Sequence, residues 1–310
     1  MKIHLGTEEI KNIKNAVVTC GTFDGVHIGH QKILSRVKEV AKEIDGETVL
    51  ITYWPHPRLV LKPWDNSLQL LSTFPEKSNL LETHGVDHLV KIPFTQEFAQ
   101  MSPEDYVRIV LHERIGAKKL IIGYDHRFGK DRAGGLPELQ QFGPKYGFEV
   151  EEIPRQDIDE IGISSTKTRR AIEVGDLESA YSFLNRPYAL TGLVVHGKKN
   201  GRKLGYPTAN IQVKEGYKLI PCDGVYAVRV CNKYRKFGGM LNIGLRPTVG
   251  GGSKTIEVHI FDFDEDIYNS EITIEFIARI RPEQKFESLE ALKAQLKEDE
   301  KSAKAALSKL

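Results

Sequence analysis

Two histidines and three glycines gather within residues 21–30, Gly-Thr-Phe-Asp-Gly-Val-His-Ile-Gly-His. The apolar run 16–20 before them predicts a buried strand, and residues 31–41 after them repeat apolar side chains at a helical period. His27 and His30 therefore fall at a helix N-terminus, where free backbone N–H groups and the helix dipole attract anions. Glycines let a phosphate approach the backbone, and imidazoles can donate to oxygens whose charge grows during reaction. We interpret the segment as a phosphate-handling site.

The pair His27 and His30 has an alternative interpretation. A bare His-x-Gly-His is more often a pair of surface or packing residues. The strand before it and the amphipathic helix after it favour the phosphate site, because that is the setting that a phosphate loop requires.

A second cluster lies in residues 192–210, where glycines and basic side chains share one loop. Such a loop can wrap a polyphosphate, with backbone N–H groups inward and cations outside. Composition alone favours a solvated hairpin tip, since the loop matches neither a Walker A motif nor G-x-G-x-x-G. Thr208 and Asn210 favour the polyphosphate-binding loop over the hairpin tip. They face the same way on an extended segment, and they carry hard oxygens that suit Mg²⁺.

The elements that must position the first cluster alternate between strand and helix. Apolar runs predict strands at 48–53, 119–122 and 148–153, and helical signals predict helices over 102–116 and 136–146. This alternation indicates a doubly wound, Rossmann-like α/β domain with a parallel sheet, in which ligands bind at the carboxyl ends of the strands. His27, His30 and Asp125 fall at that edge of the sheet.

The pattern changes near Pro187. Two short predicted helices are followed by β-type runs with turns rich in Gly, Pro and Asn: helices at 165–174 and 177–184, then strands at 189–195, 224–231, 236–243, 255–261 and 271–280. These short strands indicate an antiparallel β-barrel, and the apolar spacing that starts at Leu289 predicts a C-terminal helix. We therefore expect two domains, 1–185 and 186–310.

Composition limits the classes of protein to which the chain can belong. A length of 310 residues fits two domains, and 44 Lys and Arg against 42 Asp and Glu create no global basic field for nucleic acid or anionic lipid. The N-terminus lacks the apolar stretch of a signal peptide, and no apolar run is long enough to cross a membrane. The 3 cysteines form no C-x-x-C and indicate neither a disulfide framework nor a zinc site. We expect a cytoplasmic protein that acts on small molecules, without nucleic-acid or membrane partners.

Residues 21–30 resemble the first signature of the nucleotidylyltransferase superfamily. Their longer spelling, Gly-Thr-Phe-Asp-Gly-Val-His-x-Gly-His, is similar to the adenylylating half of prokaryotic FAD synthetases. The resemblance implies that His27 and His30 stabilise the transition state of attack on the α-phosphate of ATP, with no covalent enzyme intermediate. It also implies that ATP is bound by neighbouring residues of the turn, namely Gly21, Phe23, Asp24 and Gly25.

Two further segments fit the flavin branch of that family. Residues 54–57, Trp-Pro-His-Pro, resemble the Pro-x-Pro turn beside the isoalloxazine ring, where the Trp54 ring would stack. Residues 123–129 resemble the family loop Gly-x-Asp-Phe-Arg-Phe-Gly, with His126 where phenylalanine is usual. The flavin-binding residues that these resemblances imply are Trp54, Pro55, Pro57, Asp125 and Arg127.

Residues 163–169 resemble the second nucleotidylyltransferase signature, Ser-Ser-Thr-x-x-Arg, with Thr168 where an aliphatic residue is common. Serine and threonine at a helix start ordinarily act as N-caps. The resemblance implies instead that they hold the β- and γ-phosphates of ATP, through Ser164, Ser165, Thr166 and Arg169.

Residues 192–210 resemble the riboflavin kinase family, whose mark is Pro-Thr-Ala-Asn after a Gly-rich loop, and further landmarks of that family follow in order. The resemblance implies that Glu257 is the general base, which accepts the proton of the riboflavin 5′-hydroxyl as that oxygen attacks the γ-phosphate. A strand glutamate that points to water is the plain alternative. The other implied residues are Gly197, Lys203, Gly205, Pro207, Thr208 and Asn210 for ATP, Thr208 and Asn210 also for the metal, and Arg281 and Asp299 for the flavin.

Together these motifs identify the chain as a member of the bifunctional riboflavin kinase and FMN adenylyltransferase family. The implied reactions are riboflavin and ATP to FMN and ADP in the barrel, then FMN and ATP to FAD and diphosphate in the α/β domain, both with Mg²⁺. An adenylyltransferase for another phosphorylated acceptor, with a regulatory barrel, is the alternative enzyme. The non-enzymatic alternatives are a nucleic-acid-binding protein that uses the basic loop 198–203 and a flavin-binding regulator without chemistry.

Overall fold

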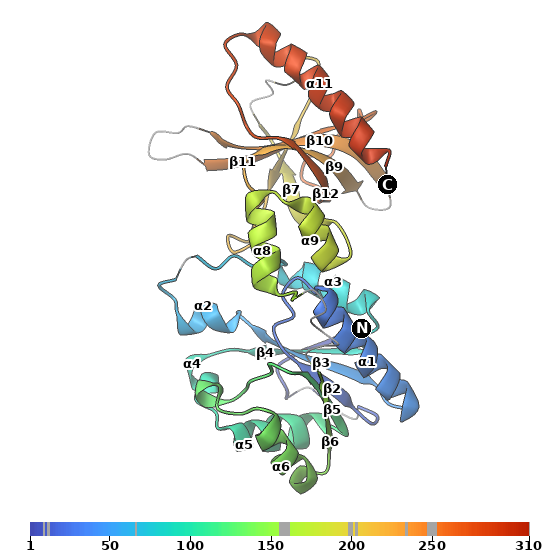
Figure 1. Ribbon diagram of the computed structural model, residues 1–310, viewed down its shortest axis with the longest axis vertical. Helices are drawn as coiled ribbons and strands as arrows, with labels where there is room; N and C mark the ends of the chain where they lie inside the picture. The colour runs from blue at the N-terminus through green and yellow to red at the C-terminus, as the bar shows by residue number, and fades with distance from the viewer. Residues whose placement is uncertain are drawn as a thin grey trace. The chain divides into compact units, whose positions relative to one another are not determined.

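Figure 1 shows the computed structural model of the chain, which describes residues 1–309 apart from 9, 11–12, 66, 155–161, 198–200, 202–203, 233–234 and 247–252. The chain folds into two compact units: Met1–Gln69 with Thr73–Ser165, and Leu70–Ser72 with Thr166–Leu310. The division lies at Ser165, ahead of the change of sequence pattern near Pro187. Helix α9 (Leu177–Leu184) and all but the first residue of α8 (Ser165–Val174) therefore belong to the same unit as the barrel.

The first unit contains the doubly wound sheet that the sequence predicts. Its 6 strands are all parallel, in the order β1-β4-β3-β2-β5-β6. The strand β2 lies inside the sheet, and all of its residues are buried, as its apolar run predicts. The strands are β1 (Lys2–Leu5), β2 (Val17–Cys20), β3 (Thr48–Trp54), β4 (His88–Pro93), β5 (Lys119–Gly123) and β6 (Glu149–Ile153).

Helices cover both faces of this sheet. Val17 of β2 faces α1, whereas the next residue, Val18, faces η1 and α6, as the alternation of side chains along a strand requires. The helix α3 packs on the same core cluster as Leu34 of α1. The helical segments are α1 (Ile28–Glu43), α2 (Pro57–Leu61), α3 (Phe74–Thr83), α4 (Gln96–Ala99), α5 (Pro103–Asp105), η1 (Tyr106–Ile115), η2 (Lys130–Arg132) and α6 (Leu136–Tyr146).

The helix predicted over 102–116 starts where the sequence indicates but continues as a π-helix. Ser102 caps its N-terminus, because the Ser102 hydroxyl accepts a hydrogen bond from the Asp105 N–H. The short helix α5 then passes into the π-helix η1, which ends at Gly116 in a left-handed conformation. The predicted N-cap and the predicted end of this helix are both confirmed.

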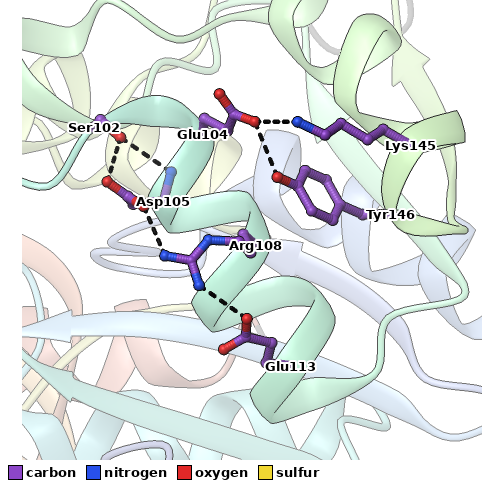
Figure 2. A network of polar contacts seen from close by, with 7 residues as sticks. All are labelled: Ser102, Glu104, Asp105, Arg108, Glu113, Lys145 and Tyr146. Carbon is purple, nitrogen blue, oxygen red and sulfur yellow. Dashed lines mark hydrogen bonds and ion pairs between the residues drawn. The ribbon is translucent and has the colours of Figure 1, made fainter.

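The π-helix brings side chains five residues apart onto one face. Figure 2 shows the result, in which Arg108 donates to Glu113 at 2.9 Å and also to Asp105 at 2.8 Å. A further contact ties this helical segment to α6, because Glu104 accepts hydrogen bonds from that helix. The donors to Glu104 are Lys145 and Tyr146.

The second unit is the predicted antiparallel barrel. Its strands close in the order β10-β11-β8-β7-β12-β9, with every pair antiparallel. Along β7, buried and partly exposed residues alternate, which fits one face toward the barrel interior. The strands are β7 (Tyr188–Val195), β8 (Ala209–Gln212), β9 (Gly224–Asn232), β10 (Arg235–Arg246), β11 (Ser253–Ile260) and β12 (Glu271–Arg281).

The C-terminal helix α11 (Leu289–Leu307) lies along the barrel and contacts β9, β10 and β12 (Figure 1). Ser288 caps its N-terminus by accepting a hydrogen bond from the Ala291 N–H. The buried residues of α11 are Asp299 and Ala303, whereas Leu289 is exposed. Helices long and apolar enough to span a membrane do not occur in the described part of the chain.

A short segment from the first half of the sequence pairs with the barrel unit. The Leu70 N–H donates to the Tyr217 carbonyl at 2.6 Å, and the Leu219 N–H donates to the Leu70 carbonyl at 2.9 Å. Lys218 is only 2% exposed, and its Nζ donates to the Leu71 carbonyl at 2.7 Å and to the Ala189 carbonyl at 2.8 Å. Backbone pairing and a buried ammonium thus fix Leu70–Ser72 to the second unit.

Candidate active sites

The turn between β2 and α1 places His27 and His30 side by side. His27 is the N-cap of α1, and its Nδ1 accepts a hydrogen bond from the His30 N–H at 3.4 Å. The two imidazole rings stack with centroids 3.7 Å apart, and the Phe23 ring lies 4.6 Å from the His30 ring. Both histidines therefore lie at the start of a helix, where negative charge is favoured.

The backbone of this turn is strained and is held by packing. Phe23 at φ 47°, Gly25 at φ 79° and Val26 at φ 41° take left-handed conformations, which are rare for a β-branched residue such as valine. Phe23 and Val26 are buried in a core cluster together with Leu34 of α1 and Leu50 of β3. Backbone strain of this kind persists only where the surroundings enforce it, and it concentrates at functional sites.

The imidazole of His30 is uncharged at neutral pH. Desolvation of the ring, with smaller contributions from the charges of His27 and Lys77, lowers the pKa of His30 well below its ordinary range. A neutral imidazole keeps one N–H with which to donate to a phosphate oxygen. His30 can therefore donate a hydrogen bond at this site while its imidazole stays uncharged.

A cavity of about 410 Å³ opens beside the turn. It brings together residues from both predicted adenylyl-site groups: Gly21, Phe23 and His30 from the ATP group, and Pro57, Asp125 and Arg127 from the flavin group. Trp54 and Pro55 do not line it. The Trp54 ring instead packs against the Phe74 ring, with centroids 5.6 Å apart.

The cavity wall also contains polar side chains that the sequence motifs did not assign to the site, among them two tyrosines, a cysteine and a histidine. The hydroxyls of Tyr53 and Tyr106 share a hydrogen bond at 2.8 Å, and the Cys20 thiol lies 3.4 Å from Nε2 of His126. Burial raises the pKa of Cys20 to about 12 and lowers the pKa of His126 to about 4, so both are neutral at pH 7. Cys20 and Tyr53 lie at the carboxyl ends of their strands. This position in the sequence could have indicated that they line the site.

The second predicted nucleotide signature lies across the division of the chain. Ser165 belongs to the first unit, where its hydroxyl donates to the Asp24 carbonyl at 3.0 Å. Ser164 precedes it in the same unit, whereas Thr166 and Arg169 belong to the second unit, on α8. The part of the signature within the first unit therefore contacts the His27 turn.

The predicted kinase residues meet on three adjacent strands of the barrel. Asn210 of β8 and Asn242 of β10 both pair in register with Glu257 of β11, so the three residues form a row across the sheet. The Thr208 hydroxyl donates to the Glu257 carboxylate at 3.2 Å. Sequence reasoning did not single out Asn242 as a site residue, although residues 242–248 are one of the further segments that resemble the riboflavin kinase family.

Two cavities share Thr208 in their walls. One, of about 320 Å³, is lined by Thr208, Asn242 and Glu257 together with Arg281 and Asp299. The other, of about 560 Å³, is lined by Pro207, Thr208 and residues 263–268. Because Thr208 lines both cavities, a group transferred from one to the other would pass beside its hydroxyl and the Glu257 carboxylate.

The glycine-rich loop before Thr208 approaches Asn210 closely. A Cβ added to Gly197 would lie only 2.1 Å from Nδ2 of Asn210, so no other residue fits without displacing that amide. Gly205 lies in the turn that precedes Pro207. The predicted ATP ligand Lys203 lies outside the described residues.

The predicted flavin residues Arg281 and Asp299 form an ion pair between β12 and α11. Arg281 donates to Asp299 through Nε at 2.9 Å and Nη2 at 2.7 Å, and Gln295 donates to the same carboxylate at 2.9 Å. Asp299 is only 1% exposed, and the Arg281 guanidinium lies 5.6 Å from the Phe286 ring centroid. Asp299 therefore orients Arg281 within the cavity wall.

The oxygen-bearing side chains near Thr208 fit a magnesium ion that is shared with phosphate. Among the described residues there is no cluster of three or more His, Cys, Asp or Glu that could hold a metal by itself. Hydroxyl, amide and carboxylate oxygens do stand together at Thr208, Asn210 and Glu257. Mg²⁺ commonly takes only one or two protein oxygens and completes its shell with water and substrate phosphates.

Comparison with known proteins matches both units to flavin enzymes. Residues 9–167 match the FAD synthetase family model, and residues 184–307 match the riboflavin kinase model. Several curated relatives have the name bifunctional riboflavin kinase/FMN adenylyltransferase. The relative from Buchnera aphidicola subsp. Schizaphis graminum is 38% identical over 96% of both chains. The relative from Pseudomonas fluorescens is 37% identical over 94% of this chain and 93% of its own. The Escherichia coli K12 relative is 36% identical over 94% of this chain and 92% of its own.

A solved structure with the same fold also matches the whole chain. It is titled as a macrolide-efflux protein from Streptococcus pneumoniae, with a TM-score of 0.89, 32% identity and coverage of 97% of this chain and 98% of its own. The curated relatives named above are more similar in sequence and share the flavin name. The chain belongs to the bifunctional riboflavin kinase/FMN adenylyltransferase family.

Proposed function

We propose that the two units carry out the two reactions named for the family in sequence, each with its own ATP. The second unit phosphorylates riboflavin to FMN, and the first unit joins FMN to AMP to give FAD and diphosphate. The observation that carries the proposal is that each unit has donor and acceptor groups at a cavity where phosphate would bind. These groups are His30, against which the His27 ring stacks, in the first unit and the Thr208–Glu257 contact in the second.

In the adenylyl reaction, a phosphate oxygen of FMN attacks the α-phosphorus of ATP, and diphosphate leaves. His27 and His30 donate to phosphate oxygens as negative charge accumulates on them in the transition state. The N-terminus of α1 adds a fixed positive potential at the same place. Ser164 and Ser165 of the first unit would hold the leaving phosphates, and Gly21, Phe23, Asp24 and Gly25 would shape the ATP site.

The flavin of the adenylyl reaction would occupy the cavity of about 410 Å³. Asp125 and Arg127 line that cavity with Pro57, and the neutral pair Cys20 and His126 forms part of its wall. Neutral donors and acceptors suit the polar edge of an uncharged ring system. The position of Trp54 against Phe74 supports a role beside this cavity, not in stacking directly within it.

In the kinase reaction, the riboflavin 5′-hydroxyl attacks the γ-phosphorus of ATP, and ADP leaves. Glu257 accepts the hydroxyl proton, and the hydrogen bond from Thr208 orients the carboxylate for that transfer. Riboflavin would occupy the cavity lined by Arg281, and the nucleotide would occupy the second cavity that Thr208 lines. Gly197, Gly205 and Pro207, with Lys203, would enclose the nucleotide phosphates.

Thr208 and Asn210 would hold Mg²⁺ in the kinase site. When bound, the ion offsets the repulsion between the attacking oxygen and the phosphate charges. The protein's own contribution is to keep these two side chains beside Glu257, through the pairing of β8 with β11. The 3 cysteines are free thiols, which fits our proposal that the enzyme works in the reducing cytoplasm.

The test is incubation of the full chain with riboflavin, ATP and Mg²⁺, with FMN and FAD resolved by chromatography. FMN should appear first and FAD after it, and chelation of Mg²⁺ should stop both steps. Consumption of FMN supplied directly, without riboflavin, isolates the adenylyl reaction. Adenylylation of a different phosphorylated acceptor in preference to FMN, with no riboflavin kinase activity, would instead favour the enzyme with a regulatory barrel.

A further inference from the structure

A lysine lies buried directly beneath the His27 turn. Lys77, on α3, is only 3% exposed, and its ammonium donates to the Thr22 carbonyl at 3.0 Å and to the Thr52 hydroxyl at 2.9 Å. Thr22 belongs to the turn itself, and Thr52 lies on the neighbouring strand β3. The ammonium therefore lies at the carboxyl ends of β2 and β3, on the same edge of the sheet as His30.

The position of Lys77 is set by the start of α3. Thr73 and Glu76 form a capping box, in which the Thr73 hydroxyl accepts from the Glu76 N–H and the Glu76 carboxylate accepts from the Thr73 N–H. The rings of Trp54 and Phe74 lie 5.4 and 5.8 Å from the ammonium. They shield it from water and offer it favourable cation–π contacts.

The two hydrogen-bond partners of the Lys77 ammonium in the described structure are neutral oxygens. Burial destabilises the ammonium, and the charge of Asp24, itself buried in the same turn, offsets only part of this effect. An apolar side chain of similar volume would fill the same space with a lower desolvation penalty. A structural brace alone therefore does not require a cation here. An anion bound at the turn gives a reason for the cation, because it would stabilise the charged form.

We infer that Lys77 is a positioning residue of the adenylyl site, which fixes the Thr22 carbonyl and adds positive potential to the turn that receives the ATP phosphates. This inference rests on the proposed function of the first unit. The Lys77 ammonium would act on the site through its hydrogen bond to the Thr22 carbonyl and through its electrostatic potential. The histidines would instead donate directly to the phosphates. The charge of Lys77 already influences His30, whose protonation it disfavours.

The charge state of Lys77 should vary with pH in the range where the enzyme is assayed. Burial lowers the pKa of Lys77 to about 8, against the opposing effect of Asp24 and with a smaller contribution from Lys91. The ammonium is therefore present below about pH 8 and is lost as the pH rises through that value. His30 remains neutral throughout, so it does not titrate in the same range.

The experiment compares Lys77→Met, which removes charge and hydrogen bonds, with Lys77→Gln, which keeps a donor but removes the charge. With FMN supplied, both should lower kcat/KM for ATP in FAD formation by about tenfold or more, less than the loss of a direct donor. Lys91→Met is the matched control, since its ammonium lies 4.3 Å from the Phe74 ring yet donates no hydrogen bond to the turn in the described structure. Riboflavin kinase activity of the same preparations should be unchanged, and Lys77→Met should not lower the melting temperature.

The pH profile separates an electrostatic role from a merely structural one. In the wild type, kcat/KM for ATP should fall above about pH 8, and this limb should be absent from both Lys77 variants. Lys77→Gln with wild-type FAD formation would overturn the inference, and so would a flat wild-type profile between pH 7 and 9.5. If the variants do not fold, the wild-type profile still decides. A wild type that makes no FAD would instead refute the proposed function.

Discussion

The histidines and the glutamate that we assign to catalysis depend on neighbours that keep their charge and orientation fixed. His30 stays neutral because its ring is desolvated and lies beside His27 and Lys77. Glu257 faces Thr208 because β8 and β11 pair in register at Asn210. His30 and Glu257 lie in separate units, so a substitution of either should leave the other reaction intact.

We predict that replacement of His30 impairs only FAD formation. The substitution His30→Ala removes a donor from the place where phosphate charge develops, and loss of such a donor typically lowers the rate by about 100-fold or more. FAD formation from FMN should fall accordingly, as measured by chromatography, while riboflavin phosphorylation persists. His112→Ala, an exposed histidine on η1, is the matched control and should keep both activities. Equal loss of both activities in His30→Ala would contradict the assignment of two sites.

A second prediction concerns Glu257. Glu257→Gln keeps the shape of the side chain and a partner for Thr208 but cannot take a proton, so FMN formation should fall by roughly 10²–10⁴-fold. FAD formation from supplied FMN should be unchanged. Glu271→Gln, an exposed glutamate at the start of β12, controls for loss of a barrel carboxylate. Wild-type kinase activity in Glu257→Gln would mean that Glu257 is a solvated strand residue.

Between elements, the ion pair of Arg281 and Asp299 joins α11 to β12 inside the kinase cavity wall. Asp299→Ala would leave the Arg281 charge in the protein without its carboxylate, which in a buried pair destabilises by about 3–5 kcal/mol. Denaturant unfolding should show this loss, and kinase activity should fall while FAD formation from FMN persists. The double replacement Arg281→Met with Asp299→Leu should recover most of the stability but not the kinase activity. Full recovery of activity would argue against a role of Arg281 in flavin binding.

The elements that sequence patterns predicted well are those with a long apolar period. The period of residues 31–41 predicted α1, and α6 and α9 agree with their predicted ranges. The π-helix η1 was predicted only as a helix, because apolar spacing over its 10 residues does not distinguish the two types. The strand β8 was not predicted as a strand, because its 4 residues are too few to show an alternation. It is this strand that places Asn210 beside Glu257.

Over the whole molecule, the contacts that sequence reasoning could not supply are those of buried lysines and of chain segments far apart in sequence. Lysine is almost never fully buried, so nothing in the local pattern indicates that Lys77 and Lys218 lie inside. Nor does any period reveal that Leu70–Ser72 pairs with residues 217–219. The motifs predicted the side chains that we assign to catalysis, whereas the contacts that support those side chains required the fold.

The arrangement of the second unit bears on where the chain can be cut. The sequence pattern favours a boundary near Pro187, and all proposed kinase residues from Gly197 to Asp299 lie beyond it. The barrel core, however, includes apolar residues of the preceding helices and of the inserted segment. They are Ala171, Ile172, Leu177, Ala180, Leu184 and Leu71. A fragment that starts at Arg186 would expose the barrel surface that these residues cover.

We therefore predict that two fragments will both phosphorylate riboflavin and make no FAD, but will differ in stability. The fragment 163–310 retains α8 and α9, whereas 186–310 loses the burial of several apolar side chains, each worth about 1.5–3 kcal/mol before the entropy of ordering the helices is subtracted. The shorter fragment should melt at a lower temperature by circular dichroism. Both fragments lack Leu70–Ser72, so Lys218 loses one carbonyl partner in each. The change in the free energy of unfolding caused by Lys218→Met should therefore be more favourable in the fragments than in the full chain. Equal melting temperatures for the two fragments would show that the helices contribute nothing to the barrel. A folded but inactive 163–310 fragment would show that the first unit is needed to complete the kinase site.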